Sequence, residues 1–448
     1  MKKNRKVSPI PRFLKHLLCG GLLLVCGLTG TVMIAAEETE AAEEAAVGAR
    51  QARQAPDWMQ DGIIYQINLR AFTPEGTLRA AAEKLPHVQE AGATIVYLMP
   101  IVLSDPDMNQ KFWSQRAITS GTNNPRNPYR TRDYTQIDSE YGTEADLKYF
   151  VQKAHSLGLR VLLDLVYYHC GPTAVIADPE KFPDFVRRDE KGDFVIGKWP
   201  FPLLNHENPA LQEYLWQNME YWVREFDVDG FRLDVSGMVP LAFWEEARRR
   251  LERIRPDLGM LSEGTKPEDQ LFAHDVNYIR FETIDDVFLA GKPASDFVTF
   301  WKKYAAQRPQ GFRNLRFFDN HDIANDDFEN RAEVRCGFER ANTALVLCAT
   351  LDGVPFWYCG QEICDKNRHS IVGWFQLDWG AAEMPEGQFR MKLCRQLADL
   401  RKCHPSLSRA PLDWIENSTP AAVLSFRRGR LLVLINTTEN RFQVRFRV

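Results

Sequence analysis

The stretch DGFRLDV, residues 229–235, is one of eight short apolar runs that together determine the expected fold. From Asp57 onward these runs alternate with amphipathic helical stretches, and no internal repeat is detectable. Such alternation is typical of α/β proteins with parallel strands, and eight strands suit a closed (β/α)₈ TIM barrel. The expected strands are residues 63–69, 94–100, 160–166, 229–235, 259–263, 277–281, 314–320 and 354–360.

Two connections within the expected catalytic barrel, residues 57–403, are long. Residues 101–142 follow the second strand, and residues 170–208 follow the third. Long loops at one end of a barrel usually build its functional site. We therefore expect residues 170–208 to form a small inserted loop domain, domain B, after the third strand.

The helical pattern stops after about residue 404. Beyond that point VLSFRRG, LLVLINTT and FQVRFRV, which begin at Val423, Leu431 and Phe442, have the pattern of antiparallel strands. Residues 404–448 are therefore expected to form a short C-terminal antiparallel β domain.

Two helices can be predicted in detail. Thr143 with Asp146 three residues later is a helix-capping pattern, and Asn208-Pro209 starts another helix. The first helix should end at Gly158. Its apolar face is expected to consist of Leu147, Phe150, Val151, Ala154 and Leu157.

The N-terminal segment, residues 1–36, carries six basic residues and no acidic one, followed by an apolar run over 17–36. This pattern predicts a signal peptide or an N-terminal membrane anchor, and hence an exported, extracytoplasmic protein. The run of about 20 residues is near the length that spans a bilayer, while residues 33–36 offer a small-residue cleavage site. We favour cleavage, and we expect the charged, Ala-rich residues 37–56 to be a linker.

Charge and cysteine content narrow the possible partners. The net charge is −4, and it becomes −10 without the six basic residues of the N-terminal segment. An acidic chain is not expected to bind nucleic acid. Seven cysteines follow residue 36 without any CxxC pair, which indicates neither a disulfide framework nor a zinc site, although one or two disulfides stay possible.

Four acidic residues stand at or just beyond the ends of expected strands: Asp164, Asp234, Glu263 and Asp322. A buried acid requires a compensating partner or a function. Each one alone could be a helix cap or part of a rim ion pair. Four at the same end of a barrel indicate an active site instead.

The pair Asp234 and Glu263 has the properties of a catalytic pair. Arg232 and Asp234 are two residues apart on one strand, so their side chains leave the same face, and the guanidinium should keep Asp234 ionised. Glu263 ends the apolar run GMLSE, an environment that raises a carboxyl pKa and suits a proton donor. The two residues together match the nucleophile and acid of a retaining glycosidase.

At these positions the sequence resembles the α-amylase family of glycoside hydrolases, glycoside hydrolase family 13, from about Gly62 to Glu362. Four ordered motifs of the family are matched in order, with NPYRTRDY (127–134) and EYGTEADLK (140–148) in flanking positions. The four motifs are DLVYYH (164–169), GFRLD (230–234), the end of LSEG (261–264) and FFDNHD (317–322).

The resemblance implies a role for each matched residue. Asp234 would be the nucleophile, Glu263 the general acid/base, and Asp322 the third acid, which holds sugar hydroxyls. Further implied residues are Arg232, which would orient Asp234; His169 and His321, which would bind sugar hydroxyls; Tyr129, which would stack on the sugar ring; and Asp164, which would support the site structurally.

Two departures from the family bear on calcium. Tyr168 stands where the first motif often has Asn, and Gly237-Met238 stand where amylases often have Lys-His. In calcium-dependent amylases that Asn and that His help to hold a structural calcium. We therefore predict that this chain lacks the calcium site, and we expect no other metal or cofactor.

The expected function is hydrolysis or transglycosylation of α-glucosidic bonds in starch-type glucans or oligosaccharides. The substrate, the linkage, and endo or exo action stay open, and Val235 after the nucleophile is only a weak sign of α-1,6 action. Aromatic residues of the two long loops could stack on further sugars or pin the loops. These residues are Phe112, Trp113, Trp199 and Phe201.

Two alternatives belong to other classes. A catalytically silent, membrane-anchored amylase-like ectodomain could serve as a binding or transport partner, but it would not require the retained acids. A barrel enzyme for phosphate-bearing substrates or a metal is disfavoured because NHDIANDD, residues 320–327, is acidic and no His cluster has metal-ligand spacing.

Overall fold

The computed structural model describes residues 47–446 except 279–281, 289 and 327–330. Among these residues, no helix is both long enough and apolar enough to span a membrane. The apolar run 17–36 lies outside the described residues, so the expected export signal or anchor stays a prediction.

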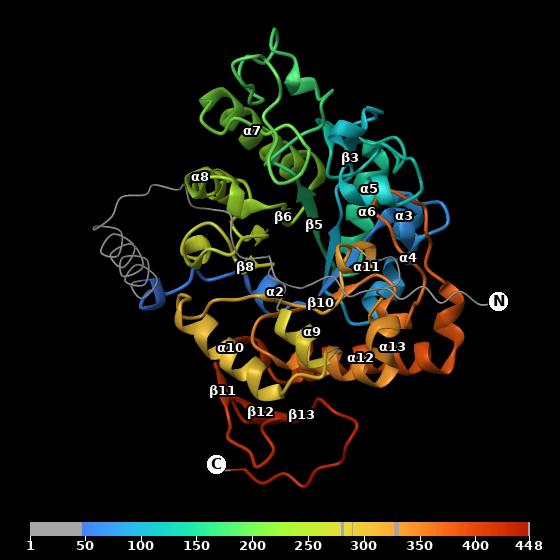
Figure 1. Ribbon diagram of the computed structural model, residues 1–448, viewed down its shortest axis with the longest axis vertical. Coiled ribbons are helices and arrows are strands. Elements are labelled where there is room, and N and C mark those ends of the chain that lie inside the picture. The colour runs from blue at the N-terminus through green and yellow to red at the C-terminus, as the bar shows by residue number, and fades with distance from the viewer. Residues whose placement is uncertain (1–46, 279–281, 289, 327–330, 447–448) are drawn as a thin grey trace, which may run out of the picture. The chain divides into compact units, whose positions relative to one another are not determined.

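The core of the fold is a sheet of eight parallel strands in the order β8-β7-β6-β5-β2-β1-β10-β9 (Figure 1). The two edge strands meet through a parallel bridge between Asn277 and Asn314, so the sheet closes on itself as a barrel. Seven of the predicted strands occur in this sheet, each shorter than its apolar run. Of the eighth, residues 277–281, only Asn277 belongs to strand β8, and residues 279–281 lie outside the described part of the chain. The bounds of the strands in the sheet are β1 Ile64–Ile67, β2 Ile95–Leu98, β5 Arg160–Leu165, β6 Gly230–Leu233, β7 Gly259–Ser262, β8 Val276–Asn277, β9 Leu315–Arg316 and β10 Val354–Tyr358.

Helices connect the strands and cover the barrel. Trp222, Trp244 and Leu85 from three of them are fully or almost fully buried against the sheet. The α-helices are α2 Asp57–Gln60, α3 Leu69–Phe72, α4 Leu78–Glu90, α5 Gln115–Thr119, α6 Glu144–Ser156, α7 Pro209–Phe226, α8 Leu241–Glu252, α9 Glu282–Phe288, α10 Ala294–Ala306, α11 Ile323–Asp326, α12 Ala332–Thr350, α13 Pro385–Cys403 and α14 Ser406–Arg409.

The two helices predicted in detail are confirmed. At the start of α6, the Thr143 hydroxyl accepts from the Asp146 backbone N–H (3.3 Å), and the Asp146 carboxylate accepts from the Thr143 N–H (3.0 Å). Gly158 follows this helix with φ of 74°, a left-handed conformation that favours glycine. Asn208 caps α7 by accepting from the Ala210 N–H at 2.9 Å.

The two long loops carry limited secondary structure. Within residues 101–142, strands β3 (Val102–Ser104) and β4 (Thr131–Ile137) pair antiparallel and enclose α5. Residues 170–208 contain short antiparallel bridges, and a bridge between His169 and Leu203 joins the two ends of this loop. Both loops follow strand ends on the same side of the barrel, because all eight strands are parallel.

The C-terminal sheet differs in one strand from the prediction. Its order is β11 (Leu412–Trp414), β12 (Val423–Arg428) and β13 (Leu431–Asn436). The predicted third strand, FQVRFRV, contributes only a bridge from Phe446 to Asn417 within its described part. Strand β11 pairs with β12 instead, and the Trp414 ring contacts the Phe426 ring at a centroid distance of 5.4 Å. A strand of only three residues is too short to be recognised from its sequence pattern.

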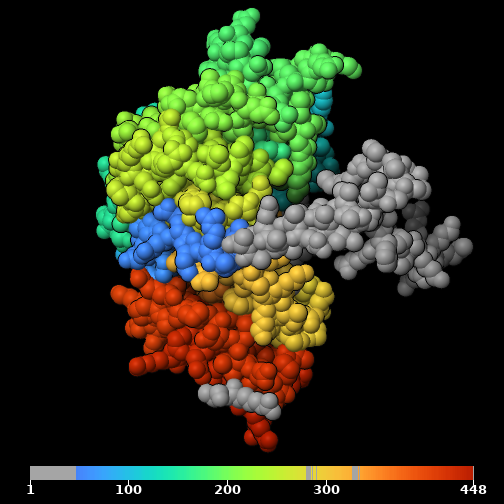
Figure 2. Space-filling view, turned by 90° about the vertical axis from the view of Figure 1, so that its left-hand side faces the viewer, coloured from blue at the N-terminus to red at the C-terminus, as the bar shows by residue number. Residues whose placement is uncertain are grey.

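The described end of the expected linker packs against the barrel. Arg53 forms ion pairs with the buried Asp275 (2.9 Å) and with Glu252 (3.0 Å). Gln51 forms a parallel bridge with Gln310, and Ala55 is buried. Figure 2 shows this early part of the described chain, in blue, lying on the surface between later segments. Composition did not reveal this attachment because it uses charges and backbone bonds rather than bulky apolar side chains.

A buried ion pair joins α12, α13 and the loop after β10. Arg390 and Glu333 are both fully buried, and the guanidinium also donates to the Asn342 side chain and to the Gln361 carbonyl. Removing one partner of such a pair leaves a buried charge without compensation. The pair therefore ties the last helices to the end of the barrel that carries the long loops.

We expect Arg390→Met to lower the free energy of unfolding by about 3–5 kcal/mol. The matched control is Arg395→Met on the same helix, because Arg395 and its partner Glu90 are 46% and 56% exposed. That change should cost less than about 1 kcal/mol. Urea unfolding followed by circular dichroism measures both values, and equal losses would contradict a stabilising role for the buried pair.

Candidate active site

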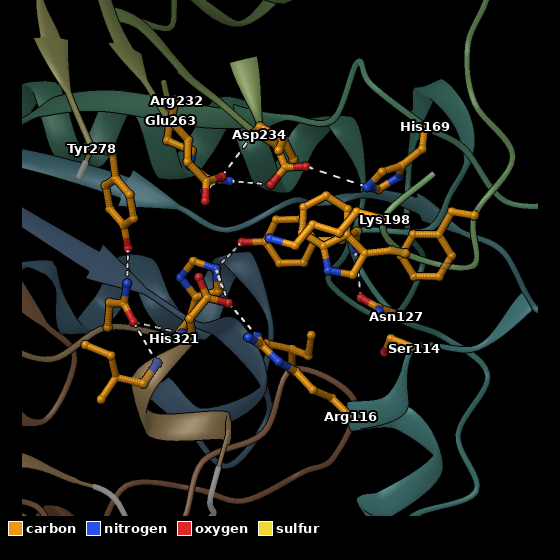
Figure 3. Close-up of a pocket in the computed structure, with 18 of the residues that line it drawn as sticks. Ser114, Arg116, Asn127, His169, Lys198, Arg232, Asp234, Glu263, Tyr278 and His321 are labelled. Atoms are coloured by element: carbon orange, nitrogen blue, oxygen red, sulfur yellow. Dashed lines mark hydrogen bonds and ion pairs between the residues drawn. The ribbon is translucent and has the colours of Figure 1, made fainter. Parts of the chain in front are cut away.

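A pocket of about 440 Å³ opens among the C-terminal ends of the barrel strands and the two long loops. It brings together seven of the eight residues singled out from the sequence (Figure 3). These seven residues are Tyr129, His169, Arg232, Asp234, Glu263, His321 and Asp322. Asp164, the eighth, is buried next to the pocket lining, where it contacts Arg232 and Tyr129.

Arg232 lies between three carboxylates. Its Nη1 is 2.9 Å from both oxygens of Asp164 and 2.8 Å from Oδ1 of Asp234, and its Nη2 is 2.5 Å from Oε2 of Glu263. The parallel register of β5 and β6 places Asp164 directly beside Arg232. The contact with Asp234 is the one expected from the sequence, whereas the equally close contact with Glu263 was not predicted.

One guanidinium cannot neutralise three carboxylates at once. Burial raises the pKa of Asp234, and although Arg232 lowers it, the charges of Glu263 and Asp164 raise it again. Burial likewise raises the pKa of Glu263, against the opposing effect of Arg232. The expectation that Arg232 alone keeps Asp234 ionised is therefore too simple, because the group as a whole holds protons more tightly than isolated carboxylates do.

His169 lies beside Asp234, with Nε2 3.9 Å from Oδ2 of that carboxylate. Its ring packs against Phe201 at a centroid distance of 4.8 Å. Burial lowers the pKa of His169 to about 3, so the imidazole is neutral at ordinary pH. It can therefore hydrogen-bond to a neutral ligand without adding charge to the site.

His321 is held by a chain of hydrogen bonds. Its backbone N–H donates to Oε1 of Gln66 (3.3 Å), so the Gln66 amide nitrogen faces His321 Nδ1 at 2.7 Å. With Nδ1 accepting, Nε2 carries the proton and donates to the Tyr129 hydroxyl at 2.8 Å. Tyr129 then donates to Asp164 at 3.0 Å, and its ring stacks on His321 at 5.4 Å. Burial lowers the pKa of His321 to about 4.

Asp322 contacts a different guanidinium from the other acids. Its Oδ1 accepts from Arg116 Nη1 at 2.5 Å, and Arg116 belongs to α5 in the loop after β2. The Asn320 side chain accepts the Asp322 backbone N–H at 2.9 Å and donates to the Tyr278 hydroxyl at 2.6 Å. Burial raises the pKa of Asp322, but the charge that His321 gains below about pH 4 and the guanidinium of Arg116 together lower it by more, so the pKa lies below its ordinary value.

Val235 shapes the backbone next to Asp234. It has φ of 44° and ψ of 35°, a left-handed conformation that a β-branched residue rarely adopts. In this conformation its N–H donates to Oε2 of Glu263 at 3.0 Å. The strained turn thus orients the Glu263 carboxylate, as is common at functional sites.

Sequence reasoning missed several pocket residues that lie outside the matched motifs, among them Arg116, Lys198 and Tyr278. Of the four loop aromatics, Trp199 and Phe201 line the pocket. Phe112 and Trp113 are buried instead, and the Trp113 indole donates to the Asp107 carbonyl at 2.9 Å, so they pin the loop.

The positions implicated in calcium binding do not fit that ion. Tyr168 packs its ring against the core, and the Met238 thioether is exposed, whereas calcium requires oxygen ligands such as carboxylates and carbonyls. Over residues 47–446, outside the gaps, no three His, Cys, Asp or Glu side chains form a group able to hold a metal. No disulfide joins the cysteines in this part of the chain.

Comparisons with known proteins agree with this geometry. A family model described as the alpha amylase catalytic domain matches residues 43–200 and 193–312. Asp234 and Glu263 lie inside the matched ranges, whereas Asp322 lies beyond them.

Individual relatives cover most of the chain. The maltogenic alpha-amylase of Bacillus acidopullulyticus is 28% identical over 454 residues, 86% of this chain and 71% of that protein. A cyclomaltodextrinase of Bacillus sp is 28% identical over 441 residues, 86% of this chain and 74% of that protein. The crystal structure of a noncanonic maltogenic alpha-amylase from Thermotoga neapolitana matches with a TM-score of 0.72 and 29% identity, covering 85% of this chain and 86% of that one.

We expect the two pocket histidines to stay neutral from pH 8 down to about pH 5.5, because their pKa values are about 3 and about 4. Ring ¹³C shifts of labelled protein, assigned with His169→Gln and His321→Gln, measure this directly. The unfolded chain takes up both protons near pH 6.5, so the free energy of unfolding should fall as the pH drops below that value. A midpoint above pH 6 for either ring would contradict the assignment.

Proposed function

This chain belongs to the α-amylase family of glycoside hydrolases, and on that premise we propose that it is a retaining α-glycosidase acting on α-glucosidic bonds of starch-type glucans or oligosaccharides. The observation that carries the proposal is the placement of Asp234 and Glu263 on one guanidinium inside the pocket. A carboxylate that attacks and a carboxylic acid that protonates are the two groups such a reaction requires.

The proposed reaction has two displacements. Glu263 gives its proton to the glycosidic oxygen while an oxygen of Asp234 attacks the anomeric carbon, so the glycosidic bond breaks and a glycosyl ester forms. Glu263, now ionised, then takes a proton from water or from an acceptor sugar hydroxyl, whose oxygen displaces Asp234. Two inversions at the same carbon give net retention.

The surroundings of the two acids support this assignment of roles. The Glu263 side chain is 31% exposed and the Asp234 side chain 8%. The more exposed carboxyl can exchange protons with solvent and reach a leaving-group oxygen. The more buried one is fixed by Arg232 and faces the neutral His169, which suits a nucleophile that must keep one orientation.

The remaining predicted residues are proposed to bind the sugar at the cleavage position. Asp322, with its lowered pKa, is ionised and can accept sugar hydroxyls and stabilise oxocarbenium charge. His169 and His321 are neutral and can bond to hydroxyls. Tyr129 offers its aromatic surface to the sugar, supported by its stacking on His321. Asp164 holds Arg232 and Tyr129 in place from below.

The names of the relatives favour maltooligosaccharides or cyclic dextrins as substrates, because two of them are called maltogenic amylase and cyclomaltodextrinase. A catalytically silent binding partner has no support here. The pocket keeps every acid that catalysis requires, whereas a binding protein would not need Glu263 and Asp234 arranged on one arginine.

Replacement of the two acids tests the mechanism. Wild type, Asp234→Asn, Glu263→Gln and the control Asp193→Asn, an exposed acid of the loop after β5, are incubated with starch, maltoheptaose, β-cyclodextrin, isomaltose and sucrose. Product-resolved chromatography should show that the rate of product formation falls about 10²–10⁴-fold in Glu263→Gln and at least as much in Asp234→Asn. The rate should not change in Asp193→Asn.

Azide separates the two roles. With an aryl α-maltoside that needs no acid, azide should restore turnover of Glu263→Ala and give the α-glycosyl azide, because Asp234 still forms the ester. Asp234→Gly should instead give the β-azide by a single displacement. The opposite pattern would exchange the roles, and absence of turnover by the wild type on every substrate would overturn the proposed function.

We also propose that activity does not depend on calcium, since the residues at the two implicated positions are unsuited to it. Dialysis against EGTA should leave kcat/KM and the melting temperature unchanged within about two-fold and about 2 °C, whereas loss of a structural metal usually destabilises the fold by several kcal/mol. A calcium-dependent amylase treated in parallel is the control. Loss of activity that added calcium restores would contradict this proposal.

A further inference from the structure

Two loops that are distant in sequence meet at Asp322. The acid follows β9, and its partner Arg116 lies 206 residues earlier in α5, within the loop after β2. Figure 3 shows the Arg116 side chain directed toward the His321 region of the pocket. Both side chains are about one-third exposed, 32% and 35%. The contact therefore lies in the pocket, not in the core of the protein.

The helix that carries Arg116 is firmly attached. Ser114 caps it, and Ala117, the residue after Arg116, is buried. Ala117 belongs to an apolar cluster that also contains Tyr129 and Ile371 of the pocket lining. At its end, the Ser120 carbonyl accepts from the Arg368 guanidinium at 2.9 Å.

The contact occupies only one side of the Asp322 carboxylate. Arg116 donates to Oδ1, and His321 Nε2 is 3.7 Å from the same oxygen. In the described part of the chain, no hydrogen bond to Oδ2 is found. A carboxylate held by one oxygen keeps a fixed orientation and can still accept a substrate hydroxyl with the other.

Resting on the proposed function, we propose that Arg116 is a positioning residue of this enzyme: its guanidinium holds Oδ1 of Asp322, so that the third acid stays ionised and presents Oδ2 to the sugar. Arg116 is not part of any motif matched to the family. It comes from a loop, whereas Arg232 comes from a barrel strand.

The charges facing Asp322 explain why a separate cation is useful. The neighbouring groups are His321 and Tyr278, which are uncharged, and Glu263, Arg116 and Arg232. Arg232 is already in contact with three carboxylates. At a pH where His321 is uncharged, Arg116 supplies the positive charge in direct contact with Asp322, with a further contribution from Arg232, so that Asp322 can stay ionised next to Glu263. Arg232 thus contacts Asp164, Asp234 and Glu263, whose protonation states influence one another, whereas Asp322 is paired with Arg116.

The simplest opposing view is that the contact is an ordinary partly exposed ion pair, which contributes little. Kinetic measurements on maltotriose separate the two views. Arg116→Gln removes the charge, Arg116→Lys keeps it without the planar fork, and Arg250→Gln is the control. Arg250 is 23% exposed and pairs with Glu213 between α7 and α8, away from the pocket.

We expect Arg116→Gln to lower kcat/KM roughly ten- to a hundred-fold, the range for loss of a charged hydrogen bond. The loss should be mainly in kcat, because Asp322 acts on the developing charge. Arg116→Lys should recover part of the loss, and Arg250→Gln should match wild type.

A double-mutant cycle with Asp322→Asn decides whether Arg116 acts through Asp322. On 4-nitrophenyl α-maltoside, Arg116→Gln should change kcat/KM less than about two-fold once Asp322 is replaced. The proposal would be overturned if Arg116→Gln lowered kcat/KM equally in the wild-type and Asp322→Asn backgrounds, or did not lower it in the wild-type background. Melting temperatures must show that the variants are folded. If wild type itself turns over no α-glucan, the proposed function has failed, which is a different outcome from an active wild type insensitive to Arg116.

Discussion

The site depends on one buried positive charge, the guanidinium of Arg232, which contacts Asp164, Asp234 and Glu263. Without that charge, three carboxylates in a water-poor pocket would repel one another and take up protons. With it, the guanidinium offsets part of the negative charge of the three carboxylates, and its hydrogen bonds fix their orientations. A glycosidase needs this state, because one of its two acids must be protonated while the other is ionised.

Arg232 can play this part only because of the barrel register. Parallel pairing sets Asp164 on β5 beside Arg232 on β6, and the next strand, β7, ends where Glu263 reaches the same guanidinium. Gly230 and Gly259 pair across β6 and β7, and a Cβ at Gly230 would lie 2.0 Å from the Gly259 carbonyl oxygen. The close approach of these strands therefore requires glycine, and it contributes to bringing the acids together.

Features on the strands were predictable from the sequence, because the C-terminal ends of all parallel strands lie on the same side of the barrel. Seven of the eight strands, the end-of-strand acids, and the neighbouring Arg232 follow from local apolar runs and a period of two. Features of the loops were predictable only where a family motif marks them, as for Tyr129 in the loop after β2. Arg116 and Lys198 both reach the pocket from loops, and the helix of Arg116 ends at Ser120, whose carbonyl is held by the distant Arg368. Strand β11 was missed for a different reason, because its three residues are too few to show a pattern without the neighbouring strand β12, where Trp414 lies opposite Phe426.

This division between strands and loops also separates two kinds of electrostatic control. The strand-borne arginine contacts Asp164, Asp234 and Glu263, so its charge is shared, and burial raises the pKa values of Asp234 and Glu263. The loop-borne arginine pairs with Asp322, whose pKa lies below its ordinary value. A fourth acid on the same guanidinium would have to share its charge as well. Arg116 supplies a second cation for Asp322, and because it comes from a loop it can vary without disturbing the strands.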